Sequence, residues 1–482
     1  ALPQVRQAEV DLSTGTATLS YPLLEWTVGS YPVRIGLSYR VGAFTTDELP
    51  GWIGLGWNLT GAGAVSRTVM GQPDELRTFE MRKSGDADID YISDLTDYRK
   101  DASLDRYSYN CPGGSGQFVI QNGHITQLPQ TNNKIELIGE EERGVRDFRI
   151  TTPDGTRYEF CERELISYHY IPFNLYAGFI PPDYMAVSSW HLSRIILTES
   201  ADTIRYEYAA APFWSRDHNR PTESITVRED PGKPEKYFWL PQIASGMFVN
   251  NNRTDFETSV IPQRIVSRSG SVEFTYDRTQ AFRMIISGMI HRDAAGNIVK
   301  KITLATDRKG RYKLQKITIT GADDTLIDEQ QFFYHERDSH YYGDLFNYPN
   351  ASSSTPYSIT TMLDPETLEL NARRKPNFNY AVSDALRQTV SATGIVTDYV
   401  YESNTIRLEK TTAPQRARSI SDTIAGNIKP ILPWPEVPDT IIHPDPPNPA
   451  APDSTVTIGI RLKSIRQRDR ITAREQTRTF SY

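Results

Sequence analysis

The glycine-rich run at residues 51–75, GWIGLGWNLTGAGAVSRTVMGQPDE, has a composition typical of ligand-binding loops. A dinucleotide-binding loop needs G-x-G-x-x-G between a strand and a helix, because the pyrophosphate lies on the helix N-terminus. Gly61 and Gly63 begin this spacing, but Ser66 stands where the third glycine should be, and the β-branched residues after it predict a strand. The chain has no G-K-[ST] of a phosphate loop either, so we expect no phosphate site.

A histidine pair follows one predicted strand. YHERDSHYYGD supplies His335, Glu336 and His340 as possible metal ligands. A helical zinc site needs histidines at i and i+4, whereas these are at i and i+5 in a β-rich stretch. We therefore interpret them as solvent-exposed turn residues.

A second histidine stretch, HRDAAGN from His291 to Asn297, resembles a kinase catalytic loop. Asn297 lies one residue too close to Asp293 for that role, and neither a glycine-rich loop of the kinase type nor D-F-G accompanies it. We predict a hairpin turn in which Gly296 and Asn297 take positive φ.

Other catalytic patterns are missing from the sequence. There is no G-x-S-x-G elbow, and Cys111 and Cys161 lie far from any recognisable His and Asn pattern. The two cysteines either stay as free thiols or form one bridge in an oxidising compartment. The run Glu140, Glu141 and Glu142 is interpreted as a solvated loop rather than an acid/base pair. We predict no catalytic, cofactor-binding or metal-ligating residue.

The C-terminal stretch 461–482 is locally basic, as a nucleic-acid-binding face would be. Alternation along a strand places most of this charge opposite Leu462 and Phe480, so we interpret it as a solvated outer face. The basic residues are Arg461, Lys463, Arg466, Arg468 and Arg470.

Overall composition agrees with this interpretation. The chain has 482 residues, a formal charge of -7, 38% hydrophobic residues and 26 tyrosines. A mildly acidic chain is not attracted to nucleic acid or to an anionic membrane surface. No apolar stretch is long enough to span a bilayer, and the first residues lack a leader pattern, so we assume that any leader has been removed.

Strands are the elements that must position these residues. An apolar/polar alternation with period two in residues 33–41, together with turn residues between the preceding strands, predicts an antiparallel meander over residues 9–42. From about residue 190, an aliphatic step, a polar turn and an aromatic-x-Tyr step recur. The copies are LSRI…YEY (192–208), PQRI…FTYD (262–277), LQKI…FFY (314–334), LRQT…YVY (386–401) and LKSI…FSY (462–482).

Each copy is predicted to be a hairpin with two aromatics on one side, and a lone hairpin cannot bury that face. Stacked copies form one long sheet with a continuous tyrosine-lined face. We therefore predict an all-β fold of antiparallel meanders and stacked hairpins, forming a large curved sheet or partial shell.

A proline-rich segment at residues 411–458 interrupts the repeats. Proline lacks a backbone donor and fixes φ, so neither a ladder nor a helix can run through it. We predict an extended surface loop that joins the two strands of the last hairpin, with a docking site for a proline-binding partner as the alternative.

The glycine run itself is predicted to be a packing feature. In a short extended segment, Trp52, Gly54 and Gly56 would share one face, and Ile53, Leu55 and Trp57 the other. Glycines beside large rings let another backbone or ring approach closely. The GQPDE sequence at its end predicts a turn.

Several segments, in this order, carry a family resemblance. They are VDLSTGTATLSYPL (10–23), PVRIGLSYR (32–40), the run at 51–75, YNCPGGSGQFVI (109–120), TTPDGTRYEF (151–160), SSWHLSRI (188–195) and GIRLKSIRQRD (459–469). The chain resembles the N-terminal region of RHS/YD-repeat proteins, in the form common in Bacteroidetes. The glycine run also resembles the entry module of toxin-complex B and plasmid-virulence B proteins.

The resemblance implies a secreted or cell-surface β-rich protein, whose Tyr-Asp hairpins coil into a shell that often encloses a C-terminal effector. This sequence departs from the pattern in several places. A strict Tyr-Asp pair occurs only at Tyr276-Asp277, the usual P-T-G-G is reduced to SATG at 391–394, and the D-P-x-G core motif is missing. We therefore expect the lead-in of a longer protein, with the remaining shell and any effector downstream.

The expected organisation is a meander with the glycine run (1–75), a β-rich middle region (76–187) and the hairpin repeats (188–482). The first functional hypothesis is a non-catalytic structural scaffold that needs no cofactor. The second is a cell-surface module that binds carbohydrate or protein, with exposed tyrosines and tryptophans stacking on sugars. The third is a hydrolase whose carboxylates are assembled in space.

Overall fold

The computed structural model describes most of the chain and confirms the predicted all-β class. Its only helix within the described ranges is the single turn α2 (Phe378–Ala381). No described helix is long and apolar enough to cross a membrane. The described residues are 9–11, 16–46, 48–76, 101, 103–171, 183–211, 214–222, 225–230, 233–241, 248–278, 284–307, 311–336, 344, 348–350, 376–408 and 454–482.

A small antiparallel sheet forms the start of the chain and confirms the predicted meander. Its strands, in spatial order, are β1 (Glu9–Asp11), β2 (Thr16–Val28), β3 (Tyr31–Val41) and β4 (Trp57–Thr60). The alternating side chains Val33, Ile35, Leu37, Tyr39 and Val41 are all at most 2% exposed. The period-two pattern therefore identified the buried face correctly.

A much larger antiparallel sheet contains most of the other strands. This sheet closes on itself because β17 pairs with β11 and β13 as well as with β14. A separate two-stranded sheet is formed by β15 (Ile225–Asp230) and β16 (Lys233–Pro241). The strands of the large sheet are β5 (Ala64–Thr68), β6 (Arg106–Cys111), β7 (Gly114–Gln121), β8 (His124–Gln127), β9 (Lys134–Glu142), β10 (Val145–Thr151), β11 (Arg157–Ile171), β12 (Tyr184–Ile196), β13 (Thr203–Ala211), β14 (Trp214–Thr222), β17 (Phe248–Ser267), β18 (Gly270–Arg278), β19 (Met284–Asp293), β20 (Ile298–Asp307), β21 (Lys313–Gly321), β22 (Leu326–Tyr334), β23 (Leu386–Ser391), β24 (Ile395–Leu408), β25 (Ser454–Asp469) and β26 (Glu475–Thr479).

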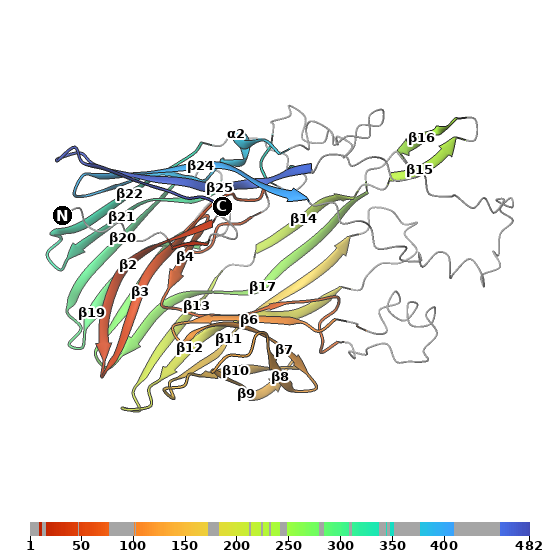
Figure 1. Ribbon diagram of the computed structural model, residues 1–482. Coiled ribbons are helices and arrows are strands. Elements are labelled where there is room, and N and C mark those ends of the chain that lie inside the picture. The colour runs from red at the N-terminus through yellow and green to blue at the C-terminus, as the bar shows by residue number, and fades with distance from the viewer. Residues whose placement is uncertain are drawn as a thin grey trace.

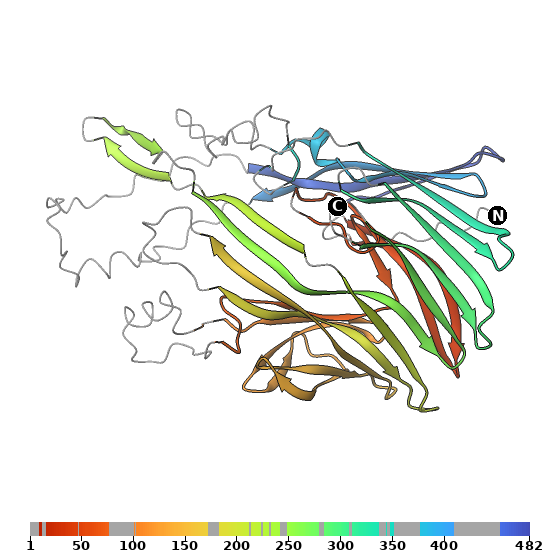
Figure 2. The same cartoon turned by 180° about the vertical axis from the view of Figure 1, so that it is seen from behind.

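The small sheet packs against the large one, and the two share one hydrophobic core (Figures 1 and 2). The rings of Tyr21 and Trp57 lie 5.2 and 4.8 Å from the ring of Phe332 on β22. At the other end of β2, Trp26 Nε1 donates to Ser267 Oγ on β17 at 3.1 Å. The curved sheet therefore buries its tyrosine-lined face against the N-terminal meander.

The five predicted hairpins are all present, as β12–β13, β17–β18, β21–β22, β23–β24 and β25–β26. A sixth hairpin, β19–β20, lies between the second and third. The turn of this sixth hairpin is the HRDAAGN sequence. Gly296 has a φ of 87°, as predicted, but the positive φ predicted for Asn297 is wrong. Asn297 instead donates its backbone N–H to Asp293 Oδ1 at 2.8 Å.

A tyrosine latch closes four of these hairpins. We use this name for the hydrogen bond from the second aromatic of a copy to the backbone carbonyl of the first residue of the same copy. The bonds are Tyr208 to Leu192 (2.9 Å), Tyr334 to Leu314 (2.6 Å), Tyr401 to Leu386 (2.6 Å) and Tyr482 to Leu462 (2.6 Å). In each case the two residues lie just beyond the last paired residues, where the two strands separate.

The second hairpin is the exception among the five copies. Pro262 occupies the position of the leucine, and the hydroxyl of Tyr276 is buried without a hydrogen-bond partner. Elsewhere, burial raises the pKa of Tyr401 well above its usual value, so its hydroxyl remains a donor. The latch therefore depends on the tyrosine and on a carbonyl at the right place, not on the aromatic pattern alone.

We predict that Tyr401→Phe lowers the free energy of unfolding by about 1–2 kcal/mol, because it leaves the carbonyl of Leu386 unpaired in the core. The matched control is Tyr276→Phe, which removes a hydroxyl that has no partner and should be neutral or slightly stabilising. Urea unfolding of both variants tests the difference. Equal losses in the two variants would show that the latch contributes nothing.

The first part of the glycine run, residues 51–63, packs between the two sheets. Leu55 N donates to Tyr312 O at 2.7 Å, and Ile286 N donates to Trp52 O at 2.8 Å. A Cβ at Gly54 would lie 3.1 Å from Tyr312 O, and one at Gly56 would lie 2.6 Å from the Phe44 ring. The predicted close approach of a backbone and a ring is confirmed.

The extended shape predicted for this run is wrong. Gly54 and Gly56 have φ values of 142° and 75°, and Trp57 N donates to Gly54 O at 3.1 Å. The segment therefore bends. The side chains of Ile53, Leu55 and Trp57 are each 1% exposed. The GQPDE turn is confirmed, since Leu76 N donates to Pro73 O at 2.8 Å.

Most of the proline-rich segment, residues 411–453, lies outside the described residues. Its predicted end at residue 458 is wrong, because β25 begins at Ser454 and opposes Leu408 at the end of β24. The alternating sequence STVTI has the β-branched residues that strands favour. The segment lies between β24 and β25, which pair with each other but belong to the fourth and fifth hairpins. The prediction that it joins the two strands of the last hairpin is therefore wrong.

Candidate functional site

Two of the histidines considered as metal ligands or catalytic groups pack against aromatic rings in the structure. His335 is half-buried and not an exposed turn residue, since its ring lies 6.0 Å from that of Tyr401; Glu336 is exposed and His340 lies outside the described residues. His291 is 7% exposed and packs on Trp26, with ring centroids 5.1 Å apart. The described part of the chain contains no group of three or more His, Cys, Asp or Glu residues suited to a metal ion.

The charged runs lie on solvated strand faces. Glu140, Glu141 and Glu142 are exposed as predicted, but they end strand β9 and do not form a loop. On β25, the predicted outer face is confirmed, and its arginines are paired with acids. These pairs are Arg461 with Glu402 (2.8 Å), Arg466 with Glu475 (3.2 Å) and Arg468 with Asp398 (2.8 Å).

Both cysteines are free thiols, which is one of the two alternatives that the sequence left open. Burial raises the pKa of Cys111 to about 11, and it also raises that of Cys161. A thiol of this kind carries almost no thiolate at neutral pH, and thiolate is the nucleophile.

A Ser-His-Glu combination that sequence reasoning missed lies in the large sheet. Ser189 Oγ donates to Glu164 Oε2 at 2.7 Å, and His191 Nε2 lies 3.3 Å from the same oxygen. Burial opposes ionisation of Glu164, but the nearby ring of His191 and hydrogen bonds from Ser189 and Val260 lower its pKa to about 2. A nucleophilic serine must bond to the histidine, whereas this serine bonds to the carboxylate. The cluster therefore links β11, β12 and β17 rather than forming a triad.

A buried ionic cluster surrounds Arg67, which lies in the glycine-rich run at residues 51–75. Arg67 Nε donates to Asp105 Oδ2 at 2.8 Å, and Nη1 donates to Glu75 Oε1 at 2.9 Å. Asp74 and Asp105 also accept each other's backbone N–H, each at 3.1 Å. In the sequence RTVMGQPDE, Arg67 is therefore followed by one of its own carboxylate partners, Glu75. Asp105, the residue just before β6, completes the cluster.

Asp74 is the strained member of this cluster. Burial, and then the negative charge of Asp105, raise the pKa of Asp74 to about 6. Its Oδ1 atom is buried without a hydrogen-bond partner. Ionisation of Asp74 therefore costs more in the folded chain than in the unfolded chain, so stability falls as the pH rises from about 4 through 6.

We predict that Asp74→Asn raises the free energy of unfolding at pH 7–8 by about 1 kcal/mol, allowing for solvent screening at this half-exposed group. The gain should vanish below about pH 3, where the carboxyl group is largely neutral in both states. The control is Asp154→Asn. A hydrogen bond from Thr152 lowers the pKa of Asp154, so removing its charge should destabilise the protein at pH 7. Urea unfolding across this pH range measures the change in unfolding free energy for each variant. A change of the same sign in both variants at pH 7 would contradict the raised pKa of Asp74.

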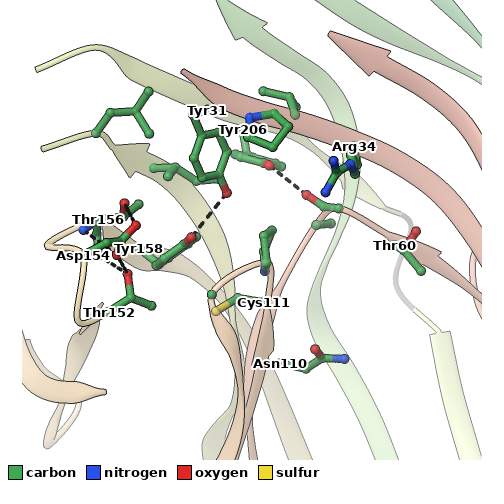
Figure 3. Close-up of a pocket in the computed structure, with 18 of the residues that line it drawn as sticks. Tyr31, Arg34, Thr60, Asn110, Cys111, Thr152, Asp154, Thr156, Tyr158 and Tyr206 are labelled. Atoms are coloured by element: carbon green, nitrogen blue, oxygen red, sulfur yellow. Dashed lines mark hydrogen bonds between the residues drawn. The ribbon is translucent and has the colours of Figure 1, made fainter. Parts of the chain in front are cut away.

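A cavity of about 820 Å³ lies between the small sheet and the large sheet. Its walls come from β3, β4, the β6–β7 turn, the β10–β11 turn and the end of β12 with β13. Figure 3 shows the hydroxyls of Tyr31 and Tyr158 facing each other, 3.3 Å apart, while Tyr206 donates to Gly61 O at 2.7 Å. Asp154 accepts from Thr156 Oγ1 at 2.9 Å and from Thr152. The carboxylate in this cavity is therefore held by hydroxyls from its own turn.

Comparisons with known proteins give similarity of structure alone. No family model matches the chain, and no curated protein matches it. One similar solved structure is the crystal structure of TcdB2-TccC3-TEV, with 10% identity and a TM-score of 0.37 over 70% of this chain and 17% of that one. Another is the N-terminal domain of effector protein SpvB from Salmonella typhimurium strain LT2, with 8% identity and a TM-score of 0.30 over 63% of this chain and 98% of that one.

Proposed function

We propose that this chain is a non-catalytic structural scaffold, the N-terminal β module of an exported RHS/YD-repeat protein, and that it helps to build or close a shell of stacked hairpins. The observation that carries the proposal is the tyrosine latch, which recurs in four hairpins of one sheet. A device repeated in this way serves the extension of a sheet, because each repeat buries the face of its neighbour.

The register of the repeats supports extension beyond β26. The latch tyrosine of one hairpin lies opposite the first residue of the next: Tyr208 opposite Pro262, Tyr334 opposite Leu386, and Tyr401 opposite Leu462. Within the described ranges β26 pairs only with β25. Tyr482 has the same latch as the others, so a following hairpin would place its first residue opposite Tyr482.

The polar clusters support a role without catalysis. Glu164 and Arg67 each tie separate parts of the chain together through hydrogen bonds, and Ser189 bonds to Glu164 rather than to His191 as a nucleophilic serine would. The proposed partners are the downstream repeats and effector of the same native chain. The proposed location is the cell surface or the medium, as the family resemblance implies.

The test uses the open edge of β26. Phe480 N donates to Lys463 O at 2.9 Å, so by strand alternation the backbone of Thr477 and Thr479 faces away from β25. A labelled peptide of residues 384–402, a hairpin of this chain, is titrated against the whole protein. We expect weak binding, with a Kd of about 1 mM or tighter, because a single hairpin is marginally stable.

Thr477→Pro removes a donor that points outward and should weaken binding of this peptide about tenfold or more while the fold is kept. Thr477→Val keeps the donor and should bind like the original chain. Circular dichroism checks the fold of both variants. No binding to the original chain, or equal binding by both variants, would refute extension at this edge.

A further inference from the structure

The cavity between the sheets has walls that are fixed in advance. The Tyr31–Tyr158 contact joins β3 to β11, and the bond from Tyr206 to Gly61 joins β13 to the end of β4. Figure 3 shows these two bonds as dashed lines. A volume of about 820 Å³ lies in the range of small-molecule sites. A ligand would therefore meet a preformed surface.

Three polar side chains on the walls are available to a ligand. Asn58 and Thr60 on β4, and Asn110 on β6, line the cavity and are exposed. None of the three makes a side-chain hydrogen bond to the parts of the chain that the structure describes. Each asparagine amide can donate and accept hydrogen bonds, and so can the threonine hydroxyl. These groups match a ligand whose own groups both donate and accept.

Charged ligands find little to pair with in this cavity. Arg34 Nε lies 3.1 Å from Glu25 Oε1, and Glu199 accepts from Ser30 Oγ at 2.9 Å. Asp154 is occupied by its own turn, as described above. Every charged side chain on the walls thus has a partner within the described chain, and a neutral ligand leaves these pairs intact.

The walls also have apolar parts. The ring of Tyr31 is half-buried, and Leu59, Ala62 and Pro112 line the same space. A ligand that combines an apolar ring face with hydroxyl groups satisfies both kinds of wall, since flat aromatic surfaces stack on such faces. We propose that this cavity binds a neutral saccharide, with Asn58, Thr60 and Asn110 bonding to its hydroxyls and Tyr31 covering a ring face.

This site differs from the exposed-aromatic surface expected from the sequence. Trp26, Trp57 and Trp190 are at most 9% exposed, so these three rings do not form such a surface. The cavity is independent of the β26 edge, so failure of one proposal leaves the other untouched.

The experiment titrates the full chain with maltose, cellobiose, lactose and N,N′-diacetylchitobiose, followed by calorimetry and intrinsic fluorescence. We expect at least one of them to bind with a Kd of about 1 mM or tighter. Asn110→Ala should weaken that binding about five- to tenfold, the effect of one lost hydrogen bond. Asn110→Trp should abolish it by filling the cavity.

Gln476→Ala is the matched control, because it removes an exposed amide on β26 that does not line the cavity. It should bind saccharide like the original chain, and circular dichroism should show all variants folded. Absence of saturable binding up to about 10 mM would overturn the proposal. Unchanged binding in both Asn110 variants would also overturn it, since the saccharide would then lie elsewhere.

Discussion

Replacing Arg67 with alanine is expected to lower the free energy of unfolding by about 3–5 kcal/mol, because removing one partner leaves the other charge buried alone. The side chains of Arg67 and Asp105 are both 0% exposed, and that of Glu75 is 9% exposed. Burial alone would lower the pKa of Arg67, but the bond to Glu75 and the charge of Asp105 raise it, so the guanidinium stays charged.

Urea unfolding at pH 7 measures this loss, with two comparisons. Arg34→Ala removes an exposed ion pair with Glu25 and should cost no more than about 0.5 kcal/mol. Arg67→Met combined with Asp105→Asn should be more stable than Arg67→Met alone, because the buried charge is then gone. A loss below about 1 kcal/mol for Arg67→Ala would show that the cluster is not a major source of stability.

The second large effect is expected for Trp57→Ala, at about 3–5 kcal/mol, as for other buried large aromatics. The ring is 1% exposed and lies 4.9 Å from the ring of Tyr39. Its Nε1 donates to the hydroxyl of Tyr334 at 2.9 Å, and Tyr334 in turn holds a latch. The variant therefore opens a cavity and also removes a bond that connects the glycine run to the repeats.

Trp57→Phe separates these two contributions in the same urea experiment. It keeps most of the packing and loses the hydrogen bond, so a loss of about 1–2 kcal/mol is expected. Trp52→Ala, at a half-buried ring in the same run, should cost less than Trp57→Ala. A change under about 1 kcal/mol for Trp57→Ala would contradict the burial of this ring.

Local patterns in the sequence were enough to predict the elements of the fold. Alternation gave the buried face of β3, and the aromatic-x-Tyr step gave five hairpins, because both signals arise from neighbouring residues. The bends at Gly54 and Gly56 were not predicted. The run packs against Tyr312 and Phe44, which lie outside it, so the residues of the run alone do not show where it bends.

The candidate site could not be predicted from the sequence, because its residues come from distant parts of the chain. Arg67 and Asp105 are 38 positions apart, and the cavity walls come from five separate parts of the chain. The latch was hidden as well, because its acceptor is a backbone carbonyl that every residue has. Only Arg67 and Glu75, eight positions apart and of opposite charge, left a local signal that could have been recognised.

The missing latch in β17–β18 gives the large sheet a weak point. Amide protons exchange with solvent first where a structure opens locally, and the open end of a hairpin is such a place. In four hairpins a tyrosine closes that end, whereas in β17–β18 the hydroxyl of Tyr276 has no hydrogen-bond partner. Among the five copies, fraying should therefore start at Pro262 and Tyr276, where no hydroxyl–carbonyl bond closes the hairpin.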